Sequence, residues 1–163
     1  MASTLEILRR LNLHEVEYVL VGGMAGVLYG SSLVTEDVDV CASFEPENLG
    51  KIVSALGDLN PRHRMNPNHP PLALNAVELA GFKNLYLITD LGQIDLLSEI
   101  SGVGGYPEVS RYSIAANMKG LVCKVLDIDS LIRARRAVGR PKDLQAAAEL
   151  EVIRRRLKGR ASQ

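Results

Sequence analysis

The apolar positions of the first thirty residues follow two periods in succession. Over residues 4–13 leucines recur every three or four positions, which predicts a helix with one apolar face. Ser3 followed by Glu6 fits a capping box, so we expect Ser3 to be the N-cap of this helix. Residues 17–21 are rich in β-branched and aromatic side chains and stop at two glycines, which predicts a strand that turns into a helix over 24–29.

The rest of the chain alternates between short strands and helices. Residues 35–42 alternate apolar and polar side chains as a strand does, and Pro46 opens a helical segment with one apolar face that ends near Gly57. Asp129 and Pro141 are expected to begin the last two helices, which extend to about 138 and about 157. Further strands are expected at 76–80, 85–90, 93–97 and 121–126, with a hairpin across 90–92 and loops at 60–71 and 102–107.

Length and composition indicate one folded unit. A chain of 163 residues holds one ordinary core, so we expect a single domain over 1–163, its core at about 4–126 and a helical tail at about 127–160. Apolar residues make up 47% and charged residues 23%, which excludes a disordered chain. No apolar run is long enough to span a membrane, which favours a cytoplasmic protein. Cys41 and Cys123 each lie in an apolar run and are expected to be buried thiols.

The net charge is +0, but the charges are unevenly distributed. Residues 131–160 carry +7 and the remainder of the chain carries −7. A solvated helix face is the usual explanation of a basic run, and binding of a polyanion, such as RNA or nucleotide phosphates, is the second. Aromatic residues make up only 4% of the chain, which argues against a surface that stacks on the bases of single strands.

Three aspartates are candidates for a metal site. Asp37 and Asp39 are two positions apart in a predicted strand, so their side chains project from the same face. Asp95 lies in a strand that is otherwise apolar enough for a core, where a charge is costly unless it is paired or bound to a cation. An isolated acidic residue in a strand is usually at the surface, but three carboxylates on neighbouring strands form the oxygen-lined site that Mg²⁺ prefers.

A glycine pair, Gly22 and Gly23, precedes these carboxylates at the end of a predicted strand. Such a turn can bring backbone N–H groups and a helix N-terminus against a triphosphate. The glycines do not form a Gly-x-Gly-x-x-Gly fingerprint, which makes a dinucleotide-dependent dehydrogenase a poor interpretation. Together, the glycine turn and the carboxylates predict phosphoryl-group chemistry, in which two metal ions would polarise a phosphate and activate an attacking hydroxyl.

Several segments carry a resemblance to a known family: VGGMAG at 21–26, YG at 29–30, TEDVDV at 35–40, QIDLL at 93–97 and GRPKDL at 139–144. In this order and spacing they resemble the polymerase-beta-like nucleotidyltransferase superfamily, and within it a small bacterial group that includes abortive-infection-type toxins. The resemblance covers about residues 4–155. It implies a mixed α/β (α+β) nucleotidyltransferase fold, with a twisted mixed sheet flanked by helices and further helices at the C-terminus.

The resemblance also implies a reaction. A nucleoside monophosphate would be transferred from an NTP to a hydroxyl acceptor, with release of pyrophosphate and with Mg²⁺ or Mn²⁺ as cofactor. By the same likeness Asp95 could act as base toward the attacking hydroxyl. The residues implied for the site are Asp37, Asp39 and Asp95 as catalytic metal ligands, Gly22 and Gly23 at the triphosphate, and Arg140 and Lys142 as further nucleotide-binding residues.

The sequence departs from the family at two positions. Leu33 stands where many relatives carry an arginine, and Met24 stands where the superfamily has a serine. Because loss of the arginine would weaken nucleotide binding, the alternative function is a catalytically weak or inactive nucleotide-binding module that acts as a sensor or interaction partner. The acceptor is open between an RNA such as tRNA, a protein hydroxyl and a small molecule. A cognate antitoxin, and a homodimer through the apolar region 107–126, are the candidate protein partners.

Overall fold

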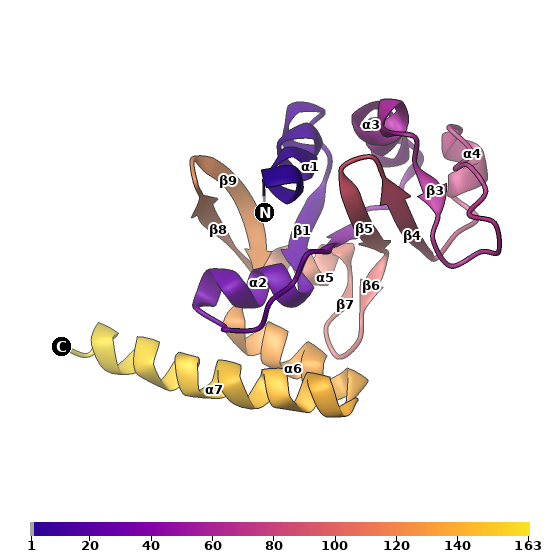
Figure 1. The fold of residues 1–163 in the computed structure, drawn as a ribbon. Coiled ribbons are helices and arrows are strands. Elements are labelled where there is room, and N and C mark those ends of the chain that lie inside the picture. Colours follow the sequence, from indigo (N-terminus) through magenta and orange to yellow (C-terminus); the bar gives the residue numbers. More distant parts are fainter. Residues whose placement is uncertain (1) are drawn as a thin grey trace.

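The computed structural model describes residues 2–163, in which seven strands form one mixed sheet (Figure 1). A two-stranded ribbon, β6 (Glu99–Ile100) with β7 (Gly104–Gly105), lies outside this sheet. In spatial order the strands of the sheet are β3 (Arg62–His63), β4 (Asn84–Thr89), β5 (Gly92–Leu97), β2 (Val38–Ala42), β1 (Tyr18–Val21), β9 (Leu121–Leu126) and β8 (Ser113–Met118).

The central strands run in both directions. β1 pairs antiparallel with β2 and parallel with β9, and β2 pairs parallel with β5. The register places Asp39 opposite Val21 on one side and opposite Asp95 on the other. Two aspartates that are far apart in the sequence therefore become direct neighbours across two parallel strands.

Helices lie on either side of the sheet. α1 (Ala2–Leu13) packs on α3 (Pro46–Leu56) and β9, whereas α2 (Gly22–Tyr29) packs on α6 and α7. In Figure 1, α1 and α3 are at the top, and α2, α6 and α7 form the lower layer. The remaining helices are the 3-10 turn η1 (Gly57–Leu59), α4 (Ala76–Leu79), α5 (Tyr106–Arg111), α6 (Ile128–Val138) and α7 (Pro141–Ala161).

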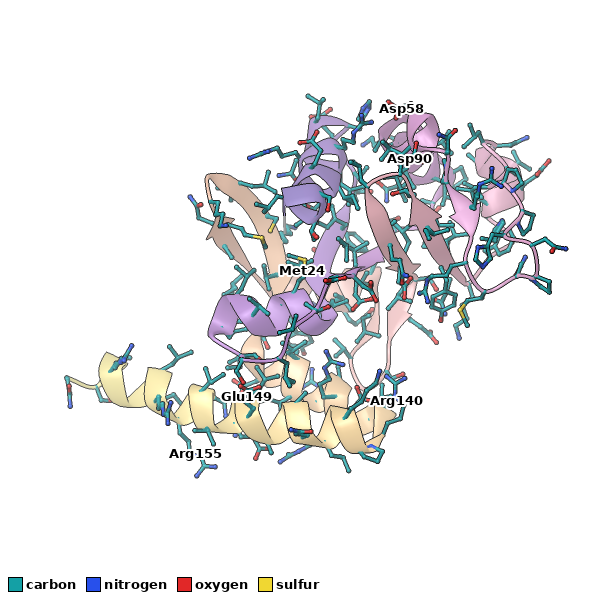
Figure 2. The ribbon with its side chains drawn as sticks, in the orientation of Figure 1. Met24, Asp58, Asp90, Arg140, Glu149 and Arg155 are labelled. Carbon is teal, nitrogen blue, oxygen red and sulfur yellow. The ribbon has the colours of Figure 1, made fainter. Side chains whose placement is uncertain are left out.

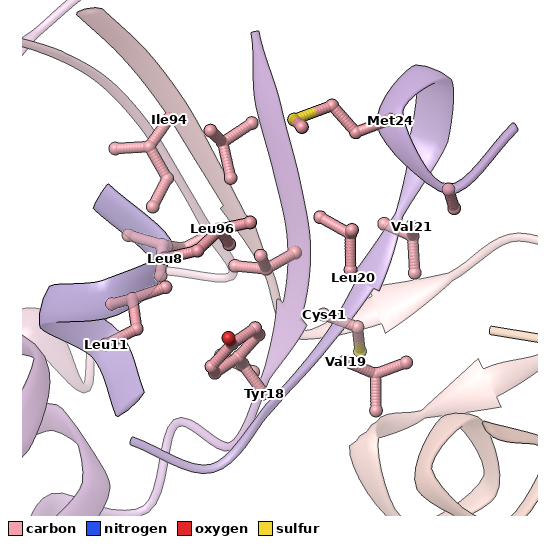
Figure 3. Close-up of a cluster of buried hydrophobic side chains, with 14 of the residues drawn as sticks. Leu8, Leu11, Tyr18, Val19, Leu20, Val21, Met24, Cys41, Ile94 and Leu96 are labelled. Atoms are coloured by element: carbon pink, nitrogen blue, oxygen red, sulfur yellow. The ribbon is translucent and has the colours of Figure 1, made fainter. Parts of the chain in front are cut away.

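The apolar core fixes the central strands. Leu8 and Leu11 of α1 belong to the same buried cluster as Leu20, Ile94 and Leu96 of the strands (Figure 3). All five side chains are fully buried, and burial of each contributes about 1.5–3 kcal/mol to folding. Because this core packs against β1 and β5, it holds the two aspartates of the adjacent β2 and β5 in register.

Most of the predicted elements are present. The strands expected at 17–21, 85–90, 93–97 and 121–126 are β1, β4, β5 and β9, and the hairpin between β4 and β5 is confirmed. The strand expected at 35–42 begins only at Val38, so Asp37 directly precedes it. Both cysteines are buried and free, as expected.

Two predicted helix caps are wrong. α1 already begins at Ala2, so Ser3 lies inside the helix. Asp129 lies inside α6, where its carboxylate pairs with Arg154 at 2.7 Å. The N-cap of α6 is Asp127, because its backbone is extended and its carboxylate accepts a hydrogen bond from the N–H of Ser130 at 2.7 Å.

The strand expected at 76–80 is wrong, because this segment is the helix α4. The side chain of Asn75 accepts a hydrogen bond from the N–H of Val77 at 2.9 Å and caps the helix, which buries Leu79. This local cap outweighs the strand propensity of so short a segment. The two expected loops are also partly regular: β3 lies within 60–71, and β7 and the start of α5 lie within 102–107. β6 and β8 were not expected.

α6 and α7 form a helical hairpin around Gly139, whose φ of 73° lies in the left-handed region that favours glycine. The first half of α7 buries Ala146, Ala147 and Leu150 against the body. Its second half is largely exposed and extends beyond the sheet (Figure 1). No helix within residues 2–163 combines the length and apolarity needed to cross a membrane.

Candidate functional site

Asp37 and Asp39 lie where β2 begins. Val38 and Val40 are fully buried, and because side chains alternate along a strand, Asp39 is turned to the opposite side. Both aspartates are half-buried. Within the described residues, neither carboxylate forms an ion pair. The two therefore form a negatively charged site that no lysine or arginine of residues 2–163 neutralises by an ion pair.

The glycine pair lies against these carboxylates. Gly22 has a φ of +67°, and a Cβ placed on it would lie 2.7 Å from the Cβ of Asp39 and still nearer to its carboxylate. A Cβ on Gly23 would lie 2.8 Å from the Cβ of Thr35. These are distances that real Cβ atoms do not adopt, so both positions require glycine. As a result, the start of α2 approaches the Asp39 carboxylate as closely as a backbone can.

Asp95 is the third aspartate, and it has a partner that the sequence does not indicate. Nη2 of Arg64 donates to both oxygens of its carboxylate, at 2.6 and 2.8 Å. Arg64 directly follows β3, and its guanidinium also lies over the ring of Tyr86, 5.9 Å from the centroid. In the sequence, Arg64 is one basic residue in an expected surface loop, with no motif around it. Only the pairing of β3 with β4 brings it to Asp95.

The carboxylates differ from ordinary ones in acidity. Burial, together with the neighbouring Asp95 and Asp37, raises the pKa of Asp39 from 3.8 to about 6, although Arg135 and the N–H of Gly23 lower it. Burial also raises the pKa of Asp95, and the hydrogen bond from Arg64 offsets only part of this effect. The negative charge on Asp39 is therefore unfavourable, and a cation bound beside it would relieve this cost.

The fit of this site to a metal ion is uneven. Carboxylate oxygens are suitable ligands for Mg²⁺ or Mn²⁺, and Asp37 and Asp39 offer them without a competing cation. Asp95 is engaged by Arg64 instead. Across residues 2–163 no three His, Cys, Asp or Glu side chains are arranged so that they could together hold a metal ion. Metal binding by the three aspartates stays a prediction, and Asp37 with Asp39 is the pair that the donor chemistry favours.

Two clefts meet at this site. The sheet cleft, about 380 Å³, is lined by Asp95, Tyr86 and Glu99, and by Arg140 of α7. The glycine cleft, about 290 Å³, is lined by Gly23, Leu33 and Asp37, and by Lys142 of α7. Gly22, Asp39 and Arg135 line both clefts. Asp39 thus lies at the junction between two binding spaces.

Basic side chains reach this junction from the C-terminal helices. Asp143 of α7 is almost completely buried, and it accepts hydrogen bonds from Arg135 at 2.9 Å and from Nε of Arg140 at 2.6 Å. Burial raises the pKa of Asp143, but these two arginines outweigh the effect and lower it. Asp143 therefore positions both guanidinium groups. The structure places Arg140 and Lys142 in different clefts, and Arg135 is a further lining residue that the sequence did not indicate.

Replacing Asp143 with asparagine is expected to lower the free energy of unfolding by about 2–3 kcal/mol, because the buried carboxylate loses its charged hydrogen bonds with Arg135 and Arg140. The matched control is Asp129→Asn, whose exposed ion pair with Arg154 contributes less than about 1 kcal/mol. Urea unfolding of both variants measures the difference. Equal losses would show that Asp143 contributes no more than a surface ion pair.

Residues 31–34 form the outer wall of the glycine cleft and are tethered to α7. Glu149 accepts hydrogen bonds from the hydroxyl of Ser31 at 2.7 Å and from the backbone N–H of Ser32 at 2.8 Å. Figure 2 shows Glu149 on the side of α7 that faces the body. Leu33 and Val34 both line the cleft, and they are 37% and 93% exposed. The leucine at the position of the family's arginine thus borders the cleft without adding charge.

Solved structures share this fold at low sequence identity. The chain aligns over 94% of its length with 97% of the lincosamide antibiotic adenylyltransferase LnuA, solved with lincomycin bound, at 15% identity and a TM-score of 0.65. It covers 89% of a Thermotoga maritima protein provisionally described as a nucleotidyltransferase, at 17% identity and a TM-score of 0.55. It covers 92% of the antibiotic-resistance factor ANT(2'')-Ia, at 13% identity and a TM-score of 0.54.

These likenesses establish the fold as that of the nucleotidyltransferases, with the mixed sheet and flanking helices expected from the sequence. No protein-family model matches the sequence, and a comparison with curated proteins finds no match. The assignment of a reaction therefore depends on the site itself.

Proposed function

We propose that the protein is a metal-dependent nucleotidyltransferase, which transfers a nucleoside monophosphate from an NTP to a hydroxyl acceptor and releases pyrophosphate. The observation that carries the proposal is the meeting of two clefts at the Asp39 carboxylate, beside the glycine turn. A nucleotide in one cleft and an acceptor in the other would have their reacting atoms at the same place, which is the requirement for a direct transfer.

The glycine cleft is the proposed nucleotide site. The N-terminus of α2 opens there with Gly22 and Gly23, and unpaired N–H groups at a helix N-terminus favour phosphate. Lys142 adds positive charge to this cleft, and so does Arg135, whose charge Asp143 partly neutralises. This charge compensates for the arginine that Leu33 replaces, and it comes from a different part of the chain.

Asp37 and Asp39 are the proposed ligands of one divalent ion, Mg²⁺ or Mn²⁺. When bound, such an ion supplies charge stabilisation for the phosphoryl group in transfer. Without a cation, the half-buried Asp39 charge remains unfavourable, as its pKa of about 6 indicates. The two carboxylates hold the ion, while the backbone of Gly22 fixes how closely the nucleotide phosphates approach Asp39.

The sheet cleft is the proposed acceptor site. Asp95 lies opposite Asp39 in the register, at a place where it can accept a hydrogen bond from an acceptor hydroxyl. An RNA acceptor, such as tRNA, is favoured by the exposed basic second half of α7, where Arg155 points away from the body (Figure 2). The alternative is a small molecule, because one of the structural neighbours is an adenylyltransferase of lincosamide antibiotics. For the biological context, we propose that the protein is a toxin that a cognate antitoxin binds.

The test is transfer of label from each NTP, labelled at the α-phosphate, in the presence of Mg²⁺ or Mn²⁺. Total tRNA and a set of hydroxyl-bearing small molecules are offered separately as acceptors. Asp37→Asn is expected to abolish the transfer, whereas Glu36→Gln, which removes the neighbouring exposed carboxylate, should leave it unchanged. Binding of NTP without transfer to any acceptor would instead favour the nucleotide-binding module without turnover.

A further inference from the structure

Arg64 engages both carboxylate oxygens of Asp95, which are the atoms that a metal ion would need as ligands. A single nitrogen of its guanidinium reaches both carboxylate oxygens, at 2.6 and 2.8 Å. The pair is well shielded from water, since the Arg64 side chain is 25% exposed and the Asp95 side chain 15%. Because the pair is charged and partly buried, breaking it would leave the Asp95 carboxylate without its partner, which costs more than breaking an exposed pair.

The backbone holds Arg64 in place. Its N–H donates to the carbonyl oxygen of Tyr86 at 2.8 Å, which extends the pairing of β3 with β4. The preceding residue, His63, stacks on Phe82 with ring centroids 5.2 Å apart. Tyr86 is also the partner of Asp95 across β4 and β5, and its ring lies under the guanidinium. Arg64 is therefore built into the sheet and does not swing freely on the exposed loop that follows it.

The charges of the site divide into two groups. Asp37 and Asp39 have no ion-pair partner in residues 2–163, whereas Asp95 already has one full positive charge at hydrogen-bond distance. A divalent ion bound to Asp95 would have to displace Arg64 or remain beside it, and like charges this close repel strongly. The three-carboxylate, two-ion arrangement expected from the sequence therefore does not fit Asp95.

We propose that Arg64 takes the place of a second metal ion, so that the site binds at most one divalent ion, on Asp37 and Asp39. Asp95 then accepts a hydrogen bond from the acceptor hydroxyl, and Arg64 holds its carboxylate in orientation. This inference rests on the proposed function, because it concerns the number of ions used in that reaction. It makes Arg64 a positioning residue that acts through Asp95.

The test counts bound Mn²⁺ ions as the difference between the Mn²⁺ added and the free Mn²⁺, which is measured by its electron paramagnetic resonance signal. The protein is kept in slight excess over a non-hydrolysable NTP analogue with a methylene bridge between the α- and β-phosphates. The parent is expected to bind one Mn²⁺ per bound analogue, and Arg64→Gln two. Arg64→Lys, which keeps a positive charge, should bind one, as should the matched control Arg62→Gln in the adjoining strand β3. Adding Asp95→Asn to Arg64→Gln should return the count to one.

Two ions in the parent would overturn the inference about Arg64 and leave the proposed function intact. No nucleotide-dependent ion in the parent would overturn both. A count of one in Arg64→Gln would also overturn the inference, provided that thermal unfolding shows the variant to be folded. Arg64→Lys is a second test of the inference. If this variant bound two ions, positive charge at position 64 would not limit metal binding.

Discussion

An Asp39→Asn variant is expected to lose nucleotidyl transfer by about a hundredfold or more, because the charge stabilisation that a bound metal ion supplies is worth several kcal/mol. The same variant is expected to be more stable than the parent at pH 8. Asparagine has nearly the same shape as aspartate and can still accept the hydrogen bond from Gly23. It removes a negative charge that is half-buried beside Asp95 and Asp37.

The pH dependence follows from the raised pKa of Asp39. The folded protein holds this proton up to about pH 6, whereas the unfolded chain releases it near 3.8. Stability of the parent therefore falls as pH rises from about 4 to about 6, and at pH 8 the loss is on the order of 2–3 kcal/mol. Asp39→Asn lacks this loss. Its advantage should be largest at pH 8 and small at pH 4, and it should vanish only below the unfolded-state pKa of 3.8, where the parent carboxyl is protonated in both states.

Urea unfolding at pH 4 and pH 8, with a chelator present, measures this difference. The chelator matters because a bound cation would lower the pKa of Asp39 and conceal the effect. Transfer assays on the same preparations measure the loss of activity. A variant that is inactive and also less stable than the parent at pH 8 would contradict the electrostatic account, because the inactivity could then come from damaged folding.

A Gly22→Ala variant is expected to lose about 2–5 kcal/mol of folding free energy and most of the activity. At a φ of +67° the added Cβ costs about 1–2 kcal/mol in backbone strain, and its collision with Asp39 adds an overpacking penalty of about 1–3 kcal/mol. To relieve the collision, Asp39 must move away from the glycine turn. The carboxylate would then no longer lie where the two clefts meet.

Gly50→Ala is the matched control for this substitution. Gly50 lies within α3, and a Cβ placed there meets no atom within 4 Å. Alanine in this helix should therefore increase stability by about 0.5–1 kcal/mol. Thermal and urea unfolding of the two variants should show changes of opposite sign. A Gly22→Ala protein as stable as Gly50→Ala would mean that the turn does not need glycine.

Local sequence patterns were sufficient for much of the fold. The β-branched run before Gly22 predicted β1, and the alternation around Val38 and Val40 predicted β2 and the shared side of Asp37 and Asp39. These predictions succeed because strand alternation depends only on neighbouring residues. The same reasoning failed at 76–80, where the Asn75 side chain caps a helix and the expected strand does not form.

The sequence by itself determined which residues could carry the chemistry: the glycine turn, the pair Asp37 and Asp39, and the isolated Asp95. Only the tertiary structure decided what each of them contacts. The pairing of β3 with β4 brings Arg64 onto Asp95, and the α6–α7 hairpin lets Asp143 hold Arg135. The physical reason is that ion pairs between distant segments leave no local pattern. They form because a buried charge must find a partner once the core has fixed the strands and helices.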